Sequence, residues 1–498
     1  AGAKPLSMEE AMPQVYAELA RVFDILETHY RDMQDIEFTV EREKLWMLQT
    51  RSGKRTAKAA LKIAVDMAQA GMITTDEAVL RVDPMALDQL LHPTLDPQAV
   101  RDVLTSGLPA SPGAASGEIV FDADTAERAA FFGRAALDAC LQLGWIPDVI
   151  HCHDWTTGLI PVLLNTTLKS SPLGRCATVL SIHNLQHQGL LSRRILPFLR
   201  LPEWLFKPEE LECLGGVNFL KGGILHANRI ITVSATYAQE ILTPALGFGL
   251  QDVVLRRQAH LDGILNGVDL DEWDAQKDKH LAKNFSAQDL AGKRACKLDL
   301  QKQFKLTDDS QAPLVGVISR LWDQKGLDLA VQALPKFLRA GRLQFVLLGS
   351  GDSWLEQEFR RLADNFPGRV GIRIGYDQAL SHRIEAGCDF FLMPSRFEPC
   401  GLNQMYSMAY GTLPIVRATG GLADTVQHWN STTHQGTGIV FQHADVGAVE
   451  WAIEQALALY ARPADFVSAQ KQAMREEFSW RKSAQAHVAS YEKALEQR

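Results

Sequence analysis

One carboxylate stands at the turn of this sequence that is best suited to chemistry. Residues 393–404 (MPSRFEPCGLNQ) place Glu398 between a short apolar run and the start of an expected helix near Leu402. Free backbone N–H groups at a helix start, aided by the helix dipole, attract phosphate oxygens. Glu398 would then lie near whatever group the phosphate carries. Taken alone, the turn favours another interpretation: a solvated loop carboxylate beside a turn glycine, Gly401.

Two cations follow another apolar run. Residues 319–326 (SRLWDQKG) place Arg320 and Lys325 five positions apart on a turn. Fixed cations beside an anion site would hold a diphosphate and stabilise its charge as it leaves. The competing interpretation, ordinary surface ion pairing, is the more common one for two cations taken alone.

Histidines end two further expected strands. His151, His153 and Asp154 lie in HCHDW, and His183 begins HNLQHQG. Cysteine or carboxylate ligands at zinc-like spacing do not accompany them, so neutral imidazoles that bind a polyhydroxylated ligand fit better than a metal site. A buried, hydrogen-bonded histidine remains the alternative for His151. Further turn glycines beside polar groups occur at 218–223 (NFLKGG), 263–269 (GILNGVD) and 419–425 (TGGLADT).

The elements that must position these residues alternate in type from about residue 131 onward. Short apolar runs separated by helical stretches predict parallel sheets with helices on both faces, an α/β doubly wound architecture. Such sheets bind ligands at the carboxyl ends of their strands, where these motifs lie. The predicted strands are 147–151, 176–182, 229–233, 314–318, 345–348, 370–374, 390–393 and 413–416.

The first 125 residues have a different pattern. Residues 8–30 predict one amphipathic helix, and the alternating runs 35–40 and 44–50 predict a β-hairpin. Helices are expected at about 56–70 and 75–81. A connector with Pro84, Pro93 and Pro97 comes next, and then a linker at 107–124 that ends in a strand-like IVF.

Composition narrows the class of protein. The chain has 498 residues, 46% hydrophobic and 22% charged, with a net charge of −8, which suggests about three globular domains and argues against nucleic-acid or membrane binding. Seven scattered cysteines indicate thiols in a reducing compartment. No apolar stretch is long enough to span a bilayer, and Glu9, Glu10 and Pro13 interrupt any signal-peptide core. We therefore expect a cytoplasmic location.

Taken together and in this order, the motifs from about residue 131 to the end resemble the bacterial glycogen synthase and plant starch synthase family. The resemblance implies a GT-B fold of two Rossmann-like doubly wound domains. It also implies a retaining glycosyltransferase that moves glucose from ADP-glucose to the non-reducing 4-OH of an α-1,4-glucan, without metal or other cofactor. The motifs are PDVIHCHDWTTGL, SIHNLQHQG, NFLKGGI, TVSATYAQEI, GILNGVD, SRLWDQKGLDL, SHRIEAG, MPSRFEPCGLNQMYSMAYGTLPIVRATGGLADTV and FSWRKSA.

The same resemblance assigns roles by position. Arg320 and Lys325 match the pair that grips the diphosphate, Glu398 the essential carboxylate near the sugar, and His153 the residue that contacts the transferred glucose. Leu402 and Asn403 would offer backbone amides to the distal phosphate, and Tyr376 would lie near the adenine. Cys400 would be a packing or loop residue rather than a nucleophile. The remaining substrate-binding matches are His183, Asn184, Asn218, Gly401, Gly420 and Gly421.

Residues 1–129 resemble a different protein, pyruvate phosphate dikinase. The resemblance implies an α+β fragment from the tail of its ATP-grasp domain, followed by the first strand of its phosphohistidine domain. The segments are EEAMPQVY, HYRDMQDIEFTVEREKLWMLQTRSGKRTAKAALKIAVDM, LRVDP, LDQLLHPTLDP and GLPASPGAASGEIVFDADTAE. Asp35, Glu37, Gln49 and Arg51 match positions that line ATP and magnesium there. The lysine and arginine that complete that site have no counterpart, so we expect a vestigial, nonfunctional ATP site of solvated hairpin side chains.

The two resemblances meet near 127–132 (ERAAFF), which makes the chain a chimera. The implied domains are 1–106, a 107–129 linker, a partial acceptor-side domain at 130–270, a nucleotide-sugar domain at 271–475, and a returning helix at 476–498. The family's KxGGL-like donor loop has no match before Phe131, so its amino-terminal sheet should be incomplete, with an open edge, and transfer impaired. A noncatalytic nucleotide- or glucan-binding module and a dikinase-derived phosphotransfer fragment are the alternatives.

Overall fold

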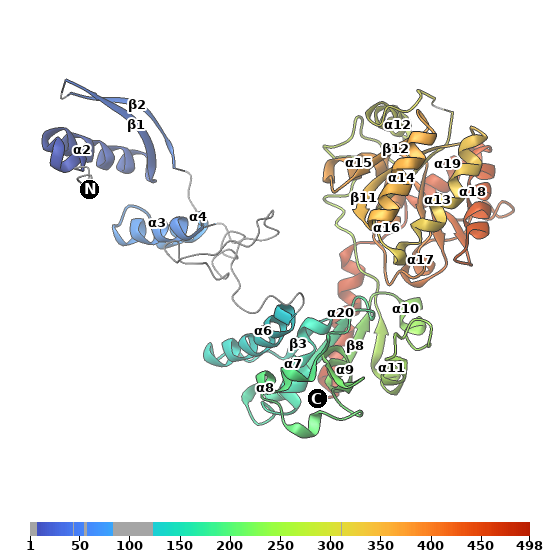
Figure 1. Ribbon diagram of the computed structural model, residues 1–498, viewed down its shortest axis with the longest axis horizontal. Helices are drawn as coiled ribbons and strands as arrows, with labels where there is room; N and C mark the ends of the chain where they lie inside the picture. Colours follow the sequence, from blue (N-terminus) through green and yellow to red (C-terminus); the bar gives the residue numbers. More distant parts are fainter. Residues whose placement is uncertain (1–6, 43, 54–56, 83–122, 310) are drawn as a thin grey trace. The chain divides into compact units, whose positions relative to one another are not determined.

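The computed structural model describes residues 7–42, 44–53, 57–82, 123–309 and 311–498. The chain divides into two compact units, Ala1–Val120 and Phe121–Arg498. In Figure 1, the described part of the first unit is blue, and the second unit runs from cyan to red. The connector prolines and the predicted strand IVF lie outside the described residues. In the part of the chain that is described, no helix combines the length and apolarity needed to cross a membrane.

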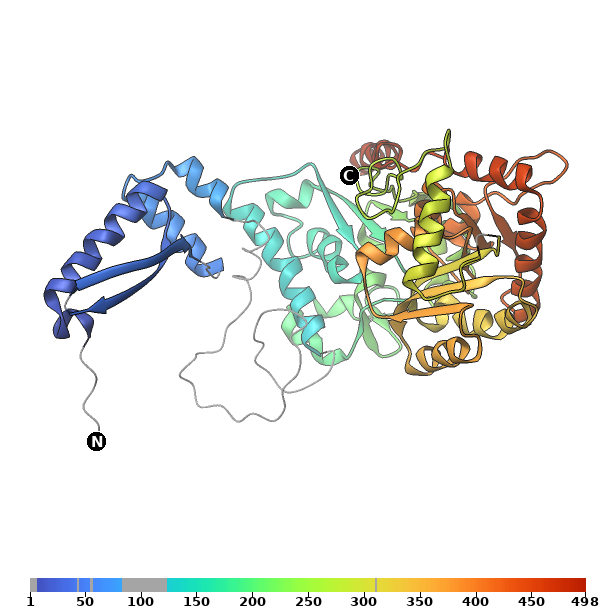
Figure 2. The ribbon, with the colours of Figure 1, turned by 90° about the horizontal axis from the view of Figure 1, so that it is seen from above.

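The first unit packs a helix on a β-hairpin. Its elements are α1 (Met8–Ala11), α2 (Pro13–Tyr30), β1 (Gln34–Glu41), β2 (Lys44–Ser52), α3 (Ala57–Gln69) and α4 (Thr75–Arg81). The antiparallel hairpin is confirmed, and α2 lies across it (Figure 2), burying Val15 and Leu19 against Leu45. The single helix predicted over 8–30 is wrong at Met12, because Pro13 has no N–H to donate and begins a new helix.

The second unit contains a lobe built on a six-stranded parallel sheet, here called the carboxyl lobe. The strand order is β12-β11-β10-β13-β14-β15. The strands are β10 (Leu314–Leu321), β11 (Gln344–Gly351), β12 (Val370–Ile374), β13 (Phe390–Met393), β14 (Leu413–Arg417) and β15 (Ile439–Phe441). Its helices are α12 (Ala291–Gln303), α13 (Leu327–Arg339), α14 (Ser353–Asn365), α15 (Gln378–Gly387), α16 (Asn403–Ala409), α17 (Gly420–Thr425), α18 (Val446–Tyr460) and α19 (Pro463–Ala473).

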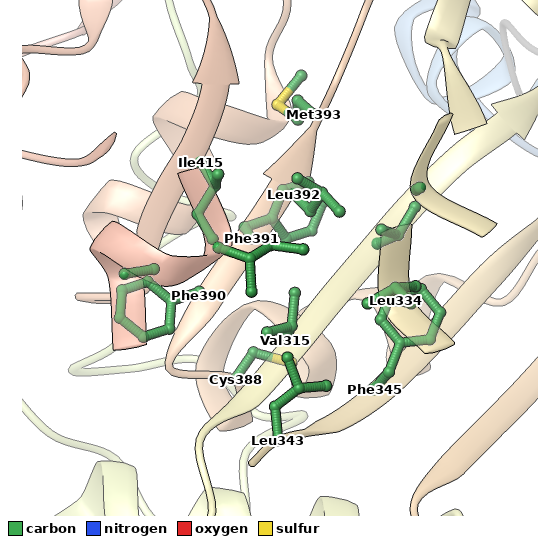
Figure 3. Close-up of a cluster of buried hydrophobic side chains, with 14 of the residues drawn as sticks. Val315, Leu334, Leu343, Phe345, Cys388, Phe390, Phe391, Leu392, Met393 and Ile415 are labelled. Atoms are coloured by element: carbon green, nitrogen blue, oxygen red, sulfur yellow. The ribbon is translucent and has the colours of Figure 1, made fainter. Parts of the chain in front are cut away.

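The predicted strands of this lobe are confirmed. Their pattern could be recognised because the sheet is buried on both faces. Val315, Phe345 and Phe391 are almost fully buried on adjoining strands, and Leu334 of α13 joins the same core (Figure 3). Continuous apolar runs of this kind are typical of a parallel sheet covered by helices on each face. Strand β15 was not predicted, because three residues are too short to show a pattern.

The other lobe, here called the amino lobe, has a four-stranded parallel sheet in the order β3-β4-β8-β9 and a small antiparallel sheet in the order β5-β7-β6. Its strands are β3 (Val149–His153), β4 (Ala177–Ile182), β5 (Leu190–Leu191), β6 (Glu212–Cys213), β7 (Gly216–Asn218), β8 (Arg229–Thr232) and β9 (Leu261–Gly263). Its helices are α6 (Ala123–Gln142), α7 (Leu159–Asn165), α8 (Leu196–Leu199), α9 (Phe219–His226), α10 (Ala235–Glu240), α11 (Gln251–Arg256) and the chain-terminal α20 (Trp480–Glu496).

Strand β3 forms one edge of that sheet. It pairs with β4 on one side, and no described strand pairs with its other side. Helix α20 returns from the end of the chain and packs against β4 and β8. This arrangement agrees with the expected open edge, because the strands that would continue the sheet past β3 are not among the described ones. Together, the two parallel sheets and their helices confirm the α/β class.

Candidate active site

A pocket of about 290 Å³ lies at the carboxyl ends of β10 and β13, where ligands of doubly wound sheets bind. Most of its functional lining comes from two predicted motifs. Arg320 reaches it from the carboxyl end of β10, Lys325 from the turn that follows β10, and Glu398 from the turn after β13. Three further lining residues, Gly401, Leu402 and Asn403, lead into α16. The structure therefore brings together six of the residues that the sequence singled out.

Glu398 and Lys325 form an ion pair inside this pocket. Their Oε2 and Nζ atoms are 2.5 Å apart, and the exposed fractions of the two side chains are only 7% and 19%. The buried Ser395 hydroxyl donates to the same Oε2 at 3.1 Å. Removal of either charge would leave the other without its ion-pair partner in a largely buried position. The pair thus fixes one carboxylate and one ammonium in a pocket of about 290 Å³.

The backbone makes this approach of the two turns possible. Gly326 ends the turn that carries Lys325 with φ of 61°, and a Cβ there would lie 2.1 Å from the Pro394 carbonyl oxygen. Only glycine fits such a position. The Asn403 side-chain amide then donates to the Ile318 carbonyl at 2.6 Å, which ties the start of α16 to β10.

Arginines that the sequence analysis missed hold the Glu398 turn from the other side. Arg396 binds both carboxylate oxygens of Asp328 at 2.7 and 2.8 Å, and hydrogen bonding from this guanidinium lowers the pKa of Asp328. Arg417 donates to the Ser395 carbonyl at 2.9 Å. Arg396 stands inside the quoted motif, but its partner lies 68 residues away. Only the fold could therefore identify the pair.

The predicted glycines at 420 and 421 lie beside the Glu398 turn but do not line the pocket. Gly421 donates its N–H to the Glu398 carbonyl at 3.1 Å. The Gly420 N–H is bound at 3.1 Å by both carboxylate oxygens of Glu240, which also accepts the Thr419 hydroxyl at 2.8 Å. A protein carboxylate from the amino lobe thus engages the Gly420 N–H, at a position that we expected to bind substrate.

Cys400 and Tyr376 lie away from the lining. Cys400 is buried with core residues of the amino lobe, and this burial raises its thiol pKa to about 11, so the thiol stays protonated at neutral pH. Tyr376 follows β12 and is 88% exposed. Its backbone neighbour Gly375 donates to the Gly349 carbonyl at 3.0 Å, which keeps the Tyr376 loop at the same carboxyl edge as Arg320.

Two histidines of the amino lobe form a stacked pair. His153 Nδ1 and His183 Nε2 are 3.0 Å apart, and the rings stack at a centroid distance of 5.3 Å. Burial is the main cause that lowers the pKa of His153, and the nearby His183 adds to it, which favours the neutral form of the His153 ring. Asp154, quoted in the motif without a role, accepts the His183 backbone N–H at 2.8 Å and orients this pair.

The two predicted asparagines make contacts within the amino lobe. The Asn184 side-chain oxygen accepts the Gln186 N–H at 3.0 Å. Asn218 is completely buried, caps α9 by accepting the Lys221 N–H at 2.9 Å, and donates to Gln188 at 2.8 Å. Local hydrogen bonds thus engage both amide groups of Asn218, and this side chain stabilises the lobe.

His151 is a half-buried neighbour of the His153–His183 pair, which agrees only in part with the alternative interpretation of a buried, hydrogen-bonded histidine. Its ring nitrogens bind the Tyr491 hydroxyl at 2.8 Å and the Ser181 hydroxyl at 2.7 Å. Burial, together with His153, His487 and His183, lowers its pKa from 6.5 to about 4. Below pH 6.5 the unfolded chain therefore binds a proton that the folded chain rejects, so stability falls as the pH drops towards 4.

We expect the change His151→Gln to flatten this pH dependence. Between pH 7 and pH 5, the free energy of unfolding of the unchanged chain should fall by about 1 kcal/mol more than that of the variant, after allowance for partial exposure. Urea unfolding at both pH values measures the difference. The exposed His187→Gln serves as the matched control, and equal pH slopes in all three proteins would contradict the assignment.

In the first unit, the four residues that we expected to form a vestigial ATP site lie on neighbouring strands of the hairpin. Asp35 pairs across the strands with Arg51, and Glu37 pairs with Gln49. The Arg51 side chain donates to Asp35 at 2.9 Å and lies 3.9 Å from Glu37. All four side chains are exposed. They thus form a solvated ladder of opposite charges.

Three family models match separate parts of the chain. The starch synthase catalytic domain matches residues 113–256, and glycosyl transferases group 1 matches residues 300–473. The AMP/ATP-binding domain of pyruvate phosphate dikinase matches residues 5–72, in agreement with the second resemblance. The chimeric character expected from the sequence is therefore confirmed.

Curated relatives and solved structures agree with the first two matches. A glycogen synthase from Thioalkalivibrio sulfidiphilus is 49% identical over 352 residues, which cover 70% of this chain and 72% of that protein. One from Koribacter versatilis is 45% identical over 376 residues, 75% of this chain and 77% of the relative. The catalytic domain of starch synthase IV from Arabidopsis thaliana, bound to ADP and acarbose, is 37% identical with a TM-score of 0.71 and covers 76% of this chain and 79% of that one.

The fold, the ion-paired carboxylate and the matched lengths all support the same family assignment. Both lobes follow the GT-B arrangement of the Arabidopsis structure, and the motifs that line the pocket fall within the matched regions. From about residue 123 onward, the chain belongs to the glycogen and starch synthase family of glycosyltransferases.

Proposed function

We propose that this chain transfers glucose from ADP-glucose to the non-reducing 4-OH of an α-1,4-glucan, with retention of the anomeric configuration. The observation that carries the proposal is the buried Glu398–Lys325 pair in a pocket that Arg320 also lines. The ADP and acarbose bound to the 37% identical Arabidopsis catalytic domain support this choice of donor and acceptor. Glycogen synthases at 45–49% identity support the same choice.

The pocket's cations suit the leaving group. Arg320 and Lys325 would hold the diphosphate and stabilise the negative charge that grows on it as the bond from the anomeric carbon breaks. The new bond forms from the acceptor 4-oxygen to the same carbon, on the same face. A phosphate oxygen of the leaving ADP accepts the proton of that hydroxyl, so a second carboxylate is not needed. Because two protein cations neutralise the diphosphate, the scheme requires no metal ion or cofactor.

Glu398 and the histidine pair would complete the scheme. The Glu398 carboxylate, fixed by Lys325 and Ser395, would stabilise the positive charge that develops at the anomeric carbon. The His153 ring, whose lowered pKa favours the neutral form, and the neighbouring His183 ring suit hydroxyl groups of the transferred glucose. Water excluded between the lobes would favour transfer over hydrolysis.

The direct test is transfer of labelled glucose from ADP-glucose to glycogen by the purified chain. We expect glycogen-dependent incorporation and an equal release of ADP, both lost in Lys325→Met. UDP-glucose, supplied in parallel, measures the choice of nucleobase. Equal incorporation by the chain and by Lys325→Met would overturn the site. Absence of incorporation by either protein would overturn the transfer activity.

The open edge of β3 favours a second candidate, a module that binds nucleotide and glucan without turnover. No described strand continues the sheet past β3, so no described loop reaches the cleft from that side. ADP binding by calorimetry, without glycogen-dependent release of ADP from ADP-glucose, would support this candidate over transfer.

Arg320 offers a separate prediction on donor affinity. Its guanidinium is exposed at the pocket, and among the described residues no ion pair engages it. A hydrogen bond to a charged group contributes about 1.5–3 kcal/mol, so Arg320→Ala should weaken ADP binding roughly 10- to 100-fold. Isothermal titration with ADP measures this change. Arg339→Ala, an exposed arginine at the end of α13, should leave the affinity unchanged, and equal losses in both variants would contradict a specific role.

A further inference from the structure

A second pocket, of about 670 Å³, lies at the far flank of the carboxyl lobe. Its lining comes from the residues that follow α17, the end of β15 and the first turns of α18. Strand β15 is an edge strand of the sheet, on the side opposite to β12 and the Tyr376 loop. The volume falls within the range of ligand pockets, about 300–1,000 Å³. We call it the Trp451 pocket.

The Trp451 pocket is uncharged, although 22% of the chain's residues carry charge. Its lining contains no Lys, Arg, Asp or Glu, and its polar groups are the side chains of Gln427, Gln442 and two histidines, His428 and His443. His428 Nδ1 accepts the Val440 N–H at 3.0 Å, and burial lowers its pKa, so this ring is neutral near pH 7. Such a lining favours an uncharged ligand that can accept and donate hydrogen bonds.

An aromatic platform stands in this pocket. Trp451 projects from α18 and keeps 46% of its surface exposed. His428 stacks against its ring, with a centroid distance of 5.9 Å and an interplanar angle of 17°. The Asp445 carboxylate caps the start of α18 by accepting the Ala448 N–H at 2.8 Å, which fixes the helix that carries the indole. A rigid, half-exposed indole with amide and imidazole groups around it suits the apolar face of a sugar ring and its outward hydroxyls.

We propose that the Trp451 pocket binds a segment of α-glucan remote from the transfer site. The choice of an α-glucan rests on the proposed function, because a polymeric acceptor has many segments besides the end that reacts. The absence of Lys, Arg, Asp and Glu from the lining supports this ligand, because an α-glucan is itself uncharged. The position also supports it: the residues that follow α17 line the pocket, and Gly421 in the first turn of the same helix donates its N–H to the Glu398 carbonyl. A polymer held there stays close to the transfer site.

The test is electrophoresis of the full chain through native gels that contain glycogen, which reports binding without any turnover. The chain should be retarded, and Trp451→Ala should raise the apparent dissociation constant for glycogen at least about fivefold. Trp451→Phe should restore most of the affinity. The matched control is Trp354→Ala, which removes another indole of the same lobe, 52% exposed on α14, and should migrate like the unchanged chain. Equal thermal unfolding temperatures would show that both variants are folded.

Each other outcome overturns the proposal. Retardation that is equal in the chain and in Trp451→Ala would exclude a glucan at this pocket, as would a chain that glycogen does not retard. A Trp451-dependent retardation that soluble maltoheptaose fails to compete would indicate an apolar surface, such as a peptide-binding groove, instead. The result is separable from the transfer assay, because Trp451 dependence without turnover would leave the pocket standing and remove only the enzymatic function.

Discussion

Glu398→Gln should reduce glucose transfer by about 10²–10³-fold while the chain still binds ADP. The amide keeps the shape of the side chain and can still accept hydrogen bonds from Lys325 and Ser395. It removes the negative charge that would face the anomeric carbon, so the effect should fall on the rate of transfer rather than on binding. Initial rates of labelled glucose incorporation measure the first quantity, and calorimetry with ADP measures the second.

A second buried glutamate of the same lobe provides the matched control. Glu385 in α15 is completely buried, and this burial raises its pKa well above the ordinary value. It does not line the pocket that holds Glu398, so Glu385→Gln should leave the transfer rate near that of the unchanged chain. Transfer by Glu398→Gln above a tenth of the unchanged rate would refute an electrostatic role for Glu398.

Gly420→Ala should strongly disrupt the junction between the two lobes. Gly420 has φ of 43°, and a Cβ there would lie 2.0 Å from the Glu398 carbonyl oxygen. The left-handed conformation alone costs about 1–2 kcal/mol for other residues, and backbone atoms cannot move aside cheaply. We expect the free energy of unfolding to fall by about 3 kcal/mol or more, together with a loss of transfer, because the Glu398 turn must shift.

Urea unfolding followed by circular dichroism measures this loss. Gly447→Ala is the matched control, because Gly447 lies in α18 and a Cβ there would meet only the Asp445 carboxylate at 3.4 Å. Alanine is favoured over glycine in a helix by about 0.5–1 kcal/mol, so this variant should be as stable as the unchanged chain or more stable. Equal unfolding midpoints for both variants would show that the turn at Gly420 can relax.

The local pattern of apolar residues predicted most strands of the two parallel sheets, but it identified fewer of the residues at the candidate site. The strands of the carboxyl lobe could be read from the sequence because burial on both faces leaves continuous apolar runs, as in Phe390–Met393. The three-residue strands Leu261–Gly263 and Ile439–Phe441 show no such pattern and owe their conformation to pairing with longer neighbours. The break at Pro13 was visible in the sequence but was overridden by the helical spacing around it.

The site residues that the sequence analysis missed were missed for one reason: their partners are distant in the sequence. Glu240 stands in a motif of the amino lobe, yet its carboxylate binds Gly420, 180 residues later. Arg396 binds Asp328 across 68 residues, and its role depends on which strands are neighbours. Glu398, Lys325 and Arg320 could be found because each lies at the carboxyl end of a strand or in the turn that follows one. Residues that orient them act through contacts that only the folded chain creates.

The junction beside Glu398 also determines how the second unit folds. Cys400 and Met405, which belong to the carboxyl lobe's site segment, are buried in the same core as Leu180 and Ile230 of the amino lobe's sheet. Thr236 binds Asp424 across the same boundary, with a backbone N–H to carboxylate distance of 2.9 Å. Separation of the lobes would therefore expose apolar side chains from the middle of a core rather than a polar seam. Their folding free energies cannot be divided between two independent domains, and the catalytic turn belongs to the shared cooperative unit.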